Sequence, residues 1–231
     1  MIKGIIFDID GVLIDTENTH FLAFRKVLET YHYDLPYEQY KQHFSGRSIK
    51  GALLSFLQEE PLVSDGQVSD FIDEVTKRKI AATIEIFRKN IVFFEDTLQF
   101  IQSIKDGNIT LKDIGEIQEK PKLALTTGLE SVLIEEVLKQ HNLNELFPII
   151  VTPGQYKKSK PDPESYLQTL ENMNCTAEET IGIEDSPSGV QALNEAGIFS
   201  IAITNTFSHD ELEQSKSIVD SLITLLPENK N

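Results

Sequence analysis

The sequence lacks the features that mark several large classes of protein. Cysteine occurs once in 231 residues, at Cys175, so an internal disulfide is impossible and we expect a reducing, cytoplasmic environment. Lysine and arginine number 21 against 37 aspartates and glutamates, and the formal net charge is −16. This balance offers no basic face for nucleic acid and disfavours an anionic membrane surface. An anionic substrate would need local lysine, arginine or metal to offset the field.

Long apolar segments are also missing. No apolar run approaches the ~18 residues of a membrane span. Asp8 and Asp10 interrupt the apolar N-terminal stretch too early for a signal peptide. The remaining composition, 40% hydrophobic and 25% charged, is that of a globular protein with one large domain, or with a core and a smaller module.

The chain is organised around residues 4–17. The apolar run Gly4-Ile-Ile-Phe7 predicts a buried strand of a parallel sheet, and Asp8 and Asp10 follow it directly. Ligands of open α/β sheets bind beyond the carboxyl ends of the strands. There, one carboxylate can attack phosphorus to form an aspartyl-phosphate, and a second can transfer protons. Two such charges beside a phosphate imply a hard divalent cation such as Mg²⁺; the alternative is a solvated turn.

Residues 16–90 predict an all-helical block. Apolar residues follow helical spacing in 21–28, 53–57 and 71–87, and no clear strand interrupts them. A helical segment inserted directly after a first buried strand predicts a small separate domain. The predicted domains are therefore 16–90, and 1–15 with 91–231.

From Glu95 the pattern alternates between helix and strand. Repeated units of this size predict an α/β fold, a Rossmann-like, doubly wound parallel sheet with helices on both faces. The predicted helices are 97–104, 131–141, 164–173 and 187–196, and the predicted strands 122–126, 148–152, 180–183 and 198–203. Residues 106–121 are long for a connection, and either one helical turn or a small hairpin fits them.

Polar residues follow three further predicted strands. Thr127 offers a hydroxyl beside free backbone N–H groups that can hold phosphate oxygens, or it lies in an ordinary turn. Lys160 can offset charge on a phosphate, or it is a solvated lysine in a basic run. Glu184 and Asp185 would complete an oxygen cage for Mg²⁺, or Asp185 caps the next helix. The conjunction of all four strand ends points to metal-assisted phosphoryl transfer.

Capping residues mark the starts of the last two predicted helices. Asp162 with Pro163, and Ser186 with Pro187, fit the N-cap and the first helical position. This capping role is sufficient for Asp162 and Pro163, but it does not explain Lys160.

These residues resemble the motifs of the haloacid dehalogenase superfamily, in particular its phosphatase and β-phosphoglucomutase-like branch. Asp8-Ile9-Asp10-Gly11-Val12 resembles the first motif, Thr127 the second, Lys160-Pro161 the third and Glu184-Asp185 the fourth. The resemblance covers essentially the whole chain, and the helical insertion resembles the mobile cap of that branch. Gly128 stands where an asparagine often follows the second motif.

The resemblance implies a role for each acid. Asp8 would be the nucleophile and a metal ligand. Asp10 would be the general acid and base, with its backbone carbonyl on the metal. Asp185 would bind Mg²⁺ directly, and Glu184 directly or through water. The presence of Asp10 argues against a metal-free dehalogenase, which resembles this fold but lacks the second acid.

The resemblance also implies which residues bind the substrate. Lys160 and Thr127 would hold the phosphoryl group. His20, Arg47 and Lys77 stand at positions resembling those of cap residues that contact the sugar phosphate in β-phosphoglucomutases. From the residues alone, His20 is an ordinary helical histidine and Arg47 a solvated arginine. Lys77 forms a charge run with Arg78 and Lys79, which is typical of a solvated face.

The sequence thus predicts a Mg²⁺-dependent phosphatase acting on a small sugar phosphate or related organic phosphate through an aspartyl-phosphate. The predicted partner is that phosphorylated metabolite, and we expect a monomer. The alternative is a phosphomutase of the β-phosphoglucomutase type, which would pass the phosphoryl group to a sugar hydroxyl instead of water. A third hypothesis is a catalytically silent phosphate-binding module.

Overall fold

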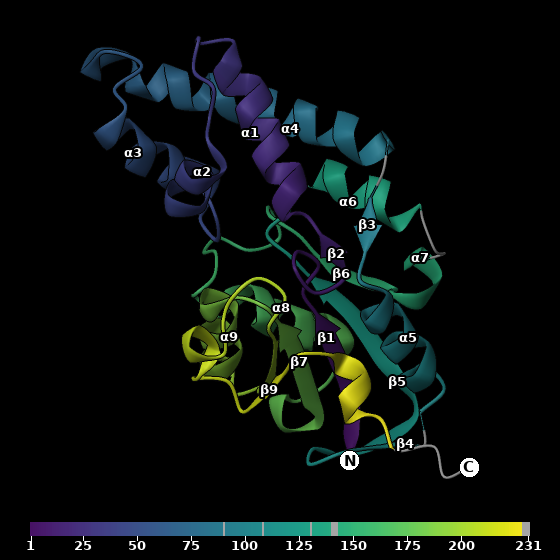
Figure 1. Ribbon diagram of the computed structural model, residues 1–231. Coiled ribbons are helices and arrows are strands. Elements are labelled where there is room, and N and C mark those ends of the chain that lie inside the picture. Colours follow the sequence, from purple (N-terminus) through teal and green to yellow (C-terminus); the bar gives the residue numbers. More distant parts are fainter. Residues whose placement is uncertain (90, 108, 130, 140–142, 228–231) are drawn as a thin grey trace. The chain divides into compact units, whose positions relative to one another are not determined.

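The computed structural model describes residues 1–89, 91–107, 109–129, 131–139 and 143–227 (Figure 1). The chain divides into two compact units. Residues 1–15 with 92–231 form the α/β unit, and residues 16–91 form the helical unit. The predicted boundary at residue 90 and the end of the predicted helix 131–141 lie outside the described residues. None of the described helices combines the length and the apolar character needed to cross a bilayer.

The α/β unit is built on a seven-stranded sheet in the order β4-β5-β1-β7-β8-β9, with β6 paired to β5. Every pairing is parallel except that of β4 with β5. The strands are β1 (Ile2–Phe7), β4 (Ile109–Leu111), β5 (Gly115–Thr126), β6 (Ile149–Val151), β7 (Thr180–Glu184), β8 (Phe199–Ile203) and β9 (Ser217–Val219). The strand order reverses at β1, where a ligand site is expected.

Helices cover both faces of this sheet (Figure 1). Because neighbouring strand residues point to opposite faces, Ile6 joins a buried cluster with Tyr166 of α8, while Phe7 packs edge-to-face on Phe100 of α5 and on Phe147. The helices are α5 (Glu95–Ile104), α6 (Ser131–Leu138), α7 (Leu143–Leu146), α8 (Glu164–Met173) and α9 (Pro187–Glu195). The predicted doubly wound α/β fold is confirmed, and so is the helical insertion after the first strand.

Residues 106–121 form a hairpin, one of the two structures that the sequence left open. Strand β4 pairs antiparallel with the first part of β5, with Ile109 opposite Ile117. Strand β5 therefore begins at Gly115, well before the predicted start at Lys122. Burial of Leu111 and Ile117 fixes the hairpin to the core of the unit.

The two predicted helix caps have different outcomes. Ser186 caps α9 as predicted, since its Oγ accepts the N–H of Gly189 at 3.1 Å. Helix α8 has the predicted range, Glu164–Met173, but Pro163 and not Asp162 is at the N-cap position. The prediction that Asp162 is the N-cap is wrong by one residue, although its carboxylate still accepts the N–H of Glu164 at 3.1 Å.

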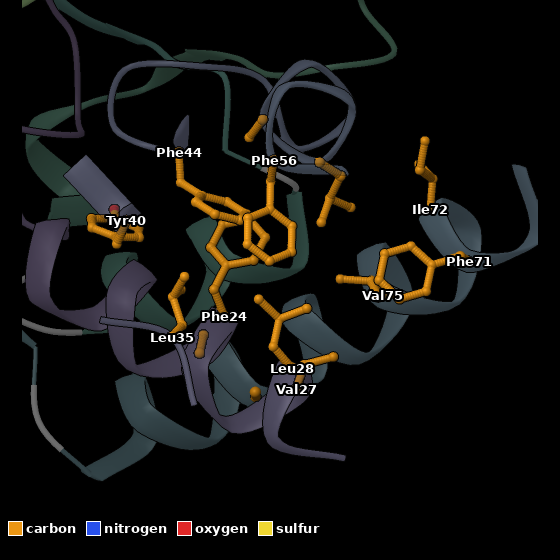
Figure 2. Packing of buried hydrophobic residues seen from close by; sticks show 14 residues of the cluster. Phe24, Val27, Leu28, Leu35, Tyr40, Phe44, Phe56, Phe71, Ile72 and Val75 are labelled. Carbon is orange, nitrogen blue, oxygen red and sulfur yellow. The ribbon is translucent and has the colours of Figure 1, made fainter. Parts of the chain in front are cut away.

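The helical unit has a hydrophobic core of its own, rich in aromatic rings (Figure 2). Its elements are α1 (Glu17–Glu29), α2 (Tyr37–His43), α3 (Ile49–Glu59), a 3₁₀ turn (Asp65–Gln67) and α4 (Val68–Lys89). The rings of Phe24 and Phe44 have centroids 4.5 Å apart, and those of Phe44 and Phe56 lie 5.3 Å apart. The three predicted helical stripes all contribute to this core; the sequence pattern does not predict the two-turn helix α2.

Two short strands complete the α/β unit. Strand β2 (Ile14–Asp15) pairs antiparallel with β3 (Val92–Phe93), so the chain leaves and re-enters this unit along one two-stranded ribbon. The hydroxyl of Thr97 donates to the carbonyl of Val12 at 2.7 Å and ties α5 to the turn after β1. Residues that follow the helical insertion in the sequence therefore hold the turn that precedes it.

Candidate active site

The candidate site lies at the carboxyl end of β1, between β5 and β7. Phe7 is in register with Ile183, and the N–H of Asp8 donates to the carbonyl of Ile183 at 3.0 Å. Asp8 therefore emerges beside Glu184, the last residue of β7. Parallel pairing of these strands brings together two acids that are far apart in the sequence.

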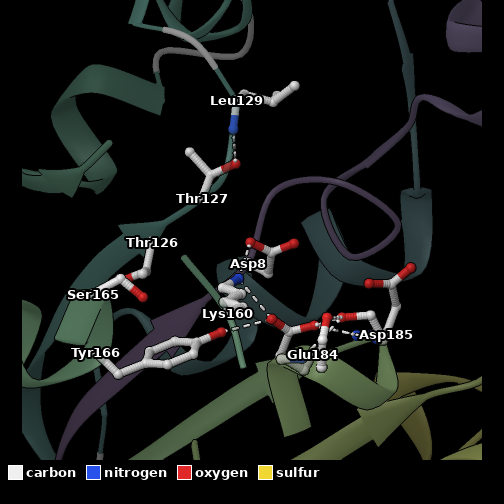
Figure 3. A network of polar contacts seen from close by, with 12 residues as sticks. Asp8, Thr126, Thr127, Leu129, Lys160, Ser165, Tyr166, Glu184 and Asp185 are labelled. Carbon is white, nitrogen blue, oxygen red and sulfur yellow. Dashed lines mark hydrogen bonds and ion pairs between the residues drawn. The ribbon is translucent and has the colours of Figure 1, made fainter. Parts of the chain in front are cut away.

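Lys160 joins these two acids (Figure 3). Its Nζ lies 2.7 Å from Oδ1 of Asp8 and 2.6 Å from Oε1 of Glu184. Burial alone would lower the pKa of Lys160, but the charges of Asp8 and Glu184 outweigh it and raise that pKa well above the usual value. A partly buried ammonium group thus lies beside the strand-end aspartate.

Glu184 is fully buried and accepts hydrogen bonds at both oxygens. Oε1 accepts from Lys160 and from Oη of Tyr166 at 2.7 Å. Oε2 accepts the N–H groups of Asp185 and Ser186 at 3.0 and 3.2 Å, and Oγ of Ser186 at 3.0 Å. Burial would raise the pKa of Glu184, but Lys160 and these hydrogen bonds lower it below the usual value. Glu184 is therefore held as an ionised carboxylate.

For Asp8 and Asp185, the effects that raise the pKa outweigh those that lower it. Burial, together with the charges of Glu184 and Asp10, raises the pKa of Asp8 to about 8 despite the opposing charge of Lys160. Burial, followed by the charges of Glu184 and Asp8, raises the pKa of Asp185 well above its usual value. Asp10 is close enough for its charge to act on both. This arrangement disfavours full ionisation unless a cation is present.

The donor set fits a divalent metal ion. Carboxylate oxygens of Asp8, Glu184 and Asp185 all lie within 4.8 Å of one another, and all three residues are buried. Hard divalent cations prefer oxygen ligands of this kind, and a cation here would offset the like charges that raise these pKa values. Asp10 is outside this carboxylate group, so its predicted contribution through a backbone carbonyl stays a prediction.

Two glycines let the acids pack this closely. A Cβ at Gly11, whose φ is +69°, would fall 1.8 Å from Oδ2 of Asp185. A Cβ at Gly189, in the first turn of α9, would fall 1.8 Å from Oε1 of Glu184. Since any side chain at either position would displace a carboxylate, both glycines are part of the site.

Thr127 is the first residue of the loop that follows β5. Its backbone N–H donates to Val151 at 3.1 Å, and its Oγ1 accepts the N–H of Leu129 at 3.1 Å, which orients a hydroxyl that still has a hydrogen to donate. The hydroxyl of Tyr156 donates to the carbonyl of Thr127 at 3.2 Å. Because Phe7 is in register with Leu125, Thr127 lies at the same sheet edge as Asp8.

The three cap residues predicted to contact the sugar phosphate, His20, Arg47 and Lys77, lie in the helical unit. Nδ1 of His20 is 2.9 Å from Nζ of Lys79, which is buried and lies 5.5 Å from the ring centroid of Phe24. Arg47 and Lys77 are exposed. The structure therefore brings His20 together with Lys79, and the interpretation of Lys79 as part of a solvated face is wrong.

Helical spacing could have identified Lys79. It follows the buried residues Ile72 and Val75 by seven and four positions, which places it on the apolar stripe of α4. The sequence pattern also does not identify Tyr156 and Tyr166, whose hydroxyls donate hydrogen bonds to Thr127 and Glu184. The spacing of Tyr166 within α8 predicts burial, but nothing in the sequence identifies the acceptor of its hydroxyl.

Two residues after β8 also support the site. Nδ2 of Asn205 donates to the carbonyl of Gly11 at 2.7 Å and fixes the turn after Asp10. Thr206 hydrogen-bonds to the carboxylate of Asp185 and partly offsets the rise in its pKa. A fifth strand end thus contributes to the site, although no catalytic pattern in the sequence marks it.

Known proteins are similar to this chain in sequence and in fold. Residues 5–203 match the family model described as haloacid dehalogenase-like hydrolase. A phosphorylated carbohydrates phosphatase of Thermotoga maritima is 32% identical over 196 residues, which cover 85% of this chain and 82% of that protein. The β-phosphoglucomutase of Bacillus subtilis is 28% identical over 87% of this chain and 83% of its own length. The crystal structure of CbbY from Rhodobacter sphaeroides in complex with phosphate has a TM-score of 0.78 at 22% identity, covering 96% and 95% of the two chains.

The fold and these matches identify the protein as a hydrolase. The chain belongs to the haloacid dehalogenase-like hydrolase family, so the family predicted from the strand-end motifs is confirmed. The likeness to CbbY, at low sequence identity, bears on the fold alone. The predicted class of enzyme is confirmed as well.

Proposed function

We propose that this hydrolase is a divalent-metal-dependent phosphatase that removes phosphate from small phosphorylated sugars or related organic phosphates. The observation that carries the proposal is the position of Asp8. Its carboxylate lies at the end of β1 and accepts a hydrogen bond from Lys160. It also belongs to the group of three buried acids with Glu184 and Asp185. The names of the Thermotoga maritima and Bacillus subtilis relatives both refer to phosphorylated carbohydrates, which supports the substrate class.

In the first half-reaction a carboxylate oxygen of Asp8 attacks phosphorus. The new Asp8–phosphorus bond forms as the bond from phosphorus to the substrate oxygen breaks, and Asp10 gives its proton to that leaving oxygen. Lys160, together with the hydroxyl of Thr127, holds the phosphoryl oxygens as their charge increases. The alcohol product then leaves.

In the second half-reaction Asp10, now ionised, takes a proton from water. The water oxygen bonds to phosphorus, the bond to Asp8 breaks, and inorganic phosphate forms while Asp10 regains its proton. Mg²⁺, held by Asp8, Asp185 and Glu184 with the carbonyl of Asp10, would neutralise the acids and the phosphate. The chain's own groups therefore account for every bond and every proton.

We assign the role of a cap that selects the substrate to the helical unit. His20 with Lys79 offers a cation at a buried position, and Arg47 and Lys77 are exposed cations of the same unit. These side chains suit recognition of the polar groups of a sugar phosphate. Exclusion of bulk water during the first transfer is the expected consequence of cap closure.

A phosphomutase is the second candidate, favoured by the 28% identity to β-phosphoglucomutase. The same aspartyl-phosphate would be transferred to a sugar hydroxyl, and the reaction would need a bisphosphate primer. A silent phosphate-binding module fits less well, since four converging acids and a partly buried lysine are costly to keep without chemistry.

The test is phosphate release from a panel of sugar and other organic phosphates, with Mg²⁺ and with chelator. The panel includes β-glucose 1-phosphate with its bisphosphate primer, and the isomer composition is followed in parallel. Metal-dependent release from one compound class supports the phosphatase. Isomerisation with little free phosphate supports the mutase, and binding without turnover across the panel contradicts both.

A further inference from the structure

Tyr166 contacts both partners of the ion pair that Lys160 and Glu184 form beside Asp8. Its hydroxyl donates to Oε1 of Glu184 at 2.7 Å, the same oxygen that Lys160 contacts at 2.6 Å. Its ring centroid lies 5.0 Å from Nζ of Lys160, within the range of a cation–π interaction. Figure 3 shows the three side chains meeting beside Asp8.

The fold holds Tyr166 rigidly. It lies in the first turn of α8, where its N–H donates to the carbonyl of Pro163 at 3.0 Å. Its side chain is fully buried in a cluster that includes Ile6 of β1 and Ala124 of β5. Because the ring is packed against the strands that carry the site, its hydroxyl occupies a fixed point relative to β1 and β7.

This fixed donor bears on where Lys160 lies. The ammonium group is shared between Asp8 at 2.7 Å and Glu184 at 2.6 Å. The Tyr166 hydroxyl occupies part of the acceptor capacity of Oε1 of Glu184 and anchors that carboxylate. Without it, the hydrogen bonds at Oε2 still hold Glu184, but Oε1 loses its fixed donor and can shift toward Lys160, which draws the ammonium group away from Asp8, where the phosphoryl charge develops.

We propose that Tyr166 is a positioning residue that anchors Glu184 and so keeps Lys160 beside Asp8. The inference rests on the proposed function, because it assigns Tyr166 to the same reaction. It also extends that function, since it makes Glu184 as much an anchor for the lysine as a metal ligand.

The first test is Tyr166→Phe, which removes the hydroxyl and keeps the ring. We expect kcat to fall about tenfold, because a hydrogen bond to a charged group is lost, while KM changes less than about threefold. The matched control is Tyr33→Phe in the helical unit, which removes a hydroxyl bonded to Gln39 and leaves the site untouched. A kcat for Tyr166→Phe within about twofold of the unmodified enzyme overturns the proposal.

The second test needs neither metal nor turnover. The side-chain ¹⁵N ammonium signal of Lys160 is recorded by NMR in the metal-free protein, and thermal unfolding in chelator verifies the fold. We expect this signal to move in Tyr166→Phe and to stay in place in Tyr33→Phe. An unmoved signal contradicts the positioning role even if activity falls.

The two tests separate this inference from the proposed function. If no phosphate ester is turned over, the proposed function fails, and the NMR signal still reports whether Tyr166 positions Lys160. If turnover depends on Asp8 but neither kcat nor the signal responds to Tyr166→Phe, the positioning role alone fails.

Discussion

Each of the two units of the molecule is stabilised internally by a different kind of interaction. In the α/β unit, the ends of five strands bring charged and polar side chains together, and Lys160 bridges Asp8 and Glu184. In the helical unit, aromatic rings fill the core, and the ring of Phe44 packs at a tilt against those of Phe24 and Phe56. Paired charges need a fixed geometry, and the parallel sheet supplies it. In the helical unit the apolar core carries the stability, so the residues of its exposed loops can change without disturbing the fold.

This difference suggests a division of labour. The α/β unit would carry out the phosphoryl chemistry, and the helical unit would choose the substrate. The exposed Arg47 lies in the loop between α2 and α3, while every acid of the candidate metal site belongs to the α/β unit. The predictions below test this division in order of decreasing effect.

The largest effect is expected for Asp8→Asn. The amide is a poor nucleophile, so turnover of every substrate should fall to background in a phosphate-release assay. The matched control is Asp113→Asn, the same change at an exposed residue in the turn between β4 and β5, which should retain normal activity. Near-normal turnover in Asp8→Asn would contradict the assignment of the phosphoryl chemistry to the α/β unit.

The next effect concerns the core of the helical unit. Phe56 is fully buried between Phe44 and Tyr33, and Phe56→Ala should cost about 3–5 kcal/mol of stability by leaving a cavity. Leu54→Ala on the same helix, where the side chain is 42% exposed, should cost less than about 0.5 kcal/mol in the same denaturant titration.

Mg²⁺ binding by the Phe56→Ala variant sharpens the comparison. Calorimetric titration should give an unchanged affinity, because the acids that form the candidate metal site belong to the α/β unit. A large loss of Mg²⁺ affinity would show that the two units do not act separately.

A smaller effect is expected from Lys79, the buried cation of the helical unit. Lys79→Met should raise KM about tenfold for the preferred substrate and lower kcat less, since a charge-assisted contact to the substrate is lost. Lys50→Met, at an exposed position on α3, is the control and should change neither. If Lys77→Met raises KM and Lys79→Met does not, the original sequence prediction holds instead.

The smallest effect is a pH dependence of the metal-free protein. The pKa of Asp8 rises from 3.8 to about 8 on folding, so the folded protein holds more protons than the unfolded chain between these values. The stability in chelator should therefore fall as pH rises through this window, and Asp185, whose pKa is also raised, acts in the same direction. The lowered pKa of Glu184 acts only below its usual 4.5.

Thermal unfolding at several pH values, with chelator and with Mg²⁺, measures this effect. Mg²⁺ should stabilise the protein more at about pH 8 than at about pH 5. Asp8→Asn should reduce the dependence, and Asp113→Asn should leave it unchanged. A metal-free protein that gains stability between these pH values would contradict the account of the buried acids.

The sequence was most informative where local pattern determines structure. The strand before Asp8, the stripes around Phe24 and Phe71, and the Ser186 cap all follow from spacing and residue type. It was less informative for 106–121, because a hairpin depends on partners such as Leu225, whose carbonyl accepts the N–H of Lys112 at 2.9 Å.

For the site, the sequence predicted the acids and the lysine but not the residues that hold them. Asp8, Lys160 and Glu184 stand at predicted strand ends, where their chemistry identifies them. Tyr166 and Asn205 act through hydroxyl and amide groups whose acceptors only the tertiary fold supplies. A side chain that positions another leaves no pattern in the sequence beyond its own burial.

The most direct measurement is capture of the phosphorylated enzyme. The enzyme is mixed with its best substrate and Mg²⁺, quenched in acid within one turnover, digested and examined by mass spectrometry. We predict one phosphoryl group on the peptide that carries Asp8, and none in Asp8→Asn. Rapid turnover with no phosphoryl group on Asp8, or with the group on another residue, would contradict the central claim.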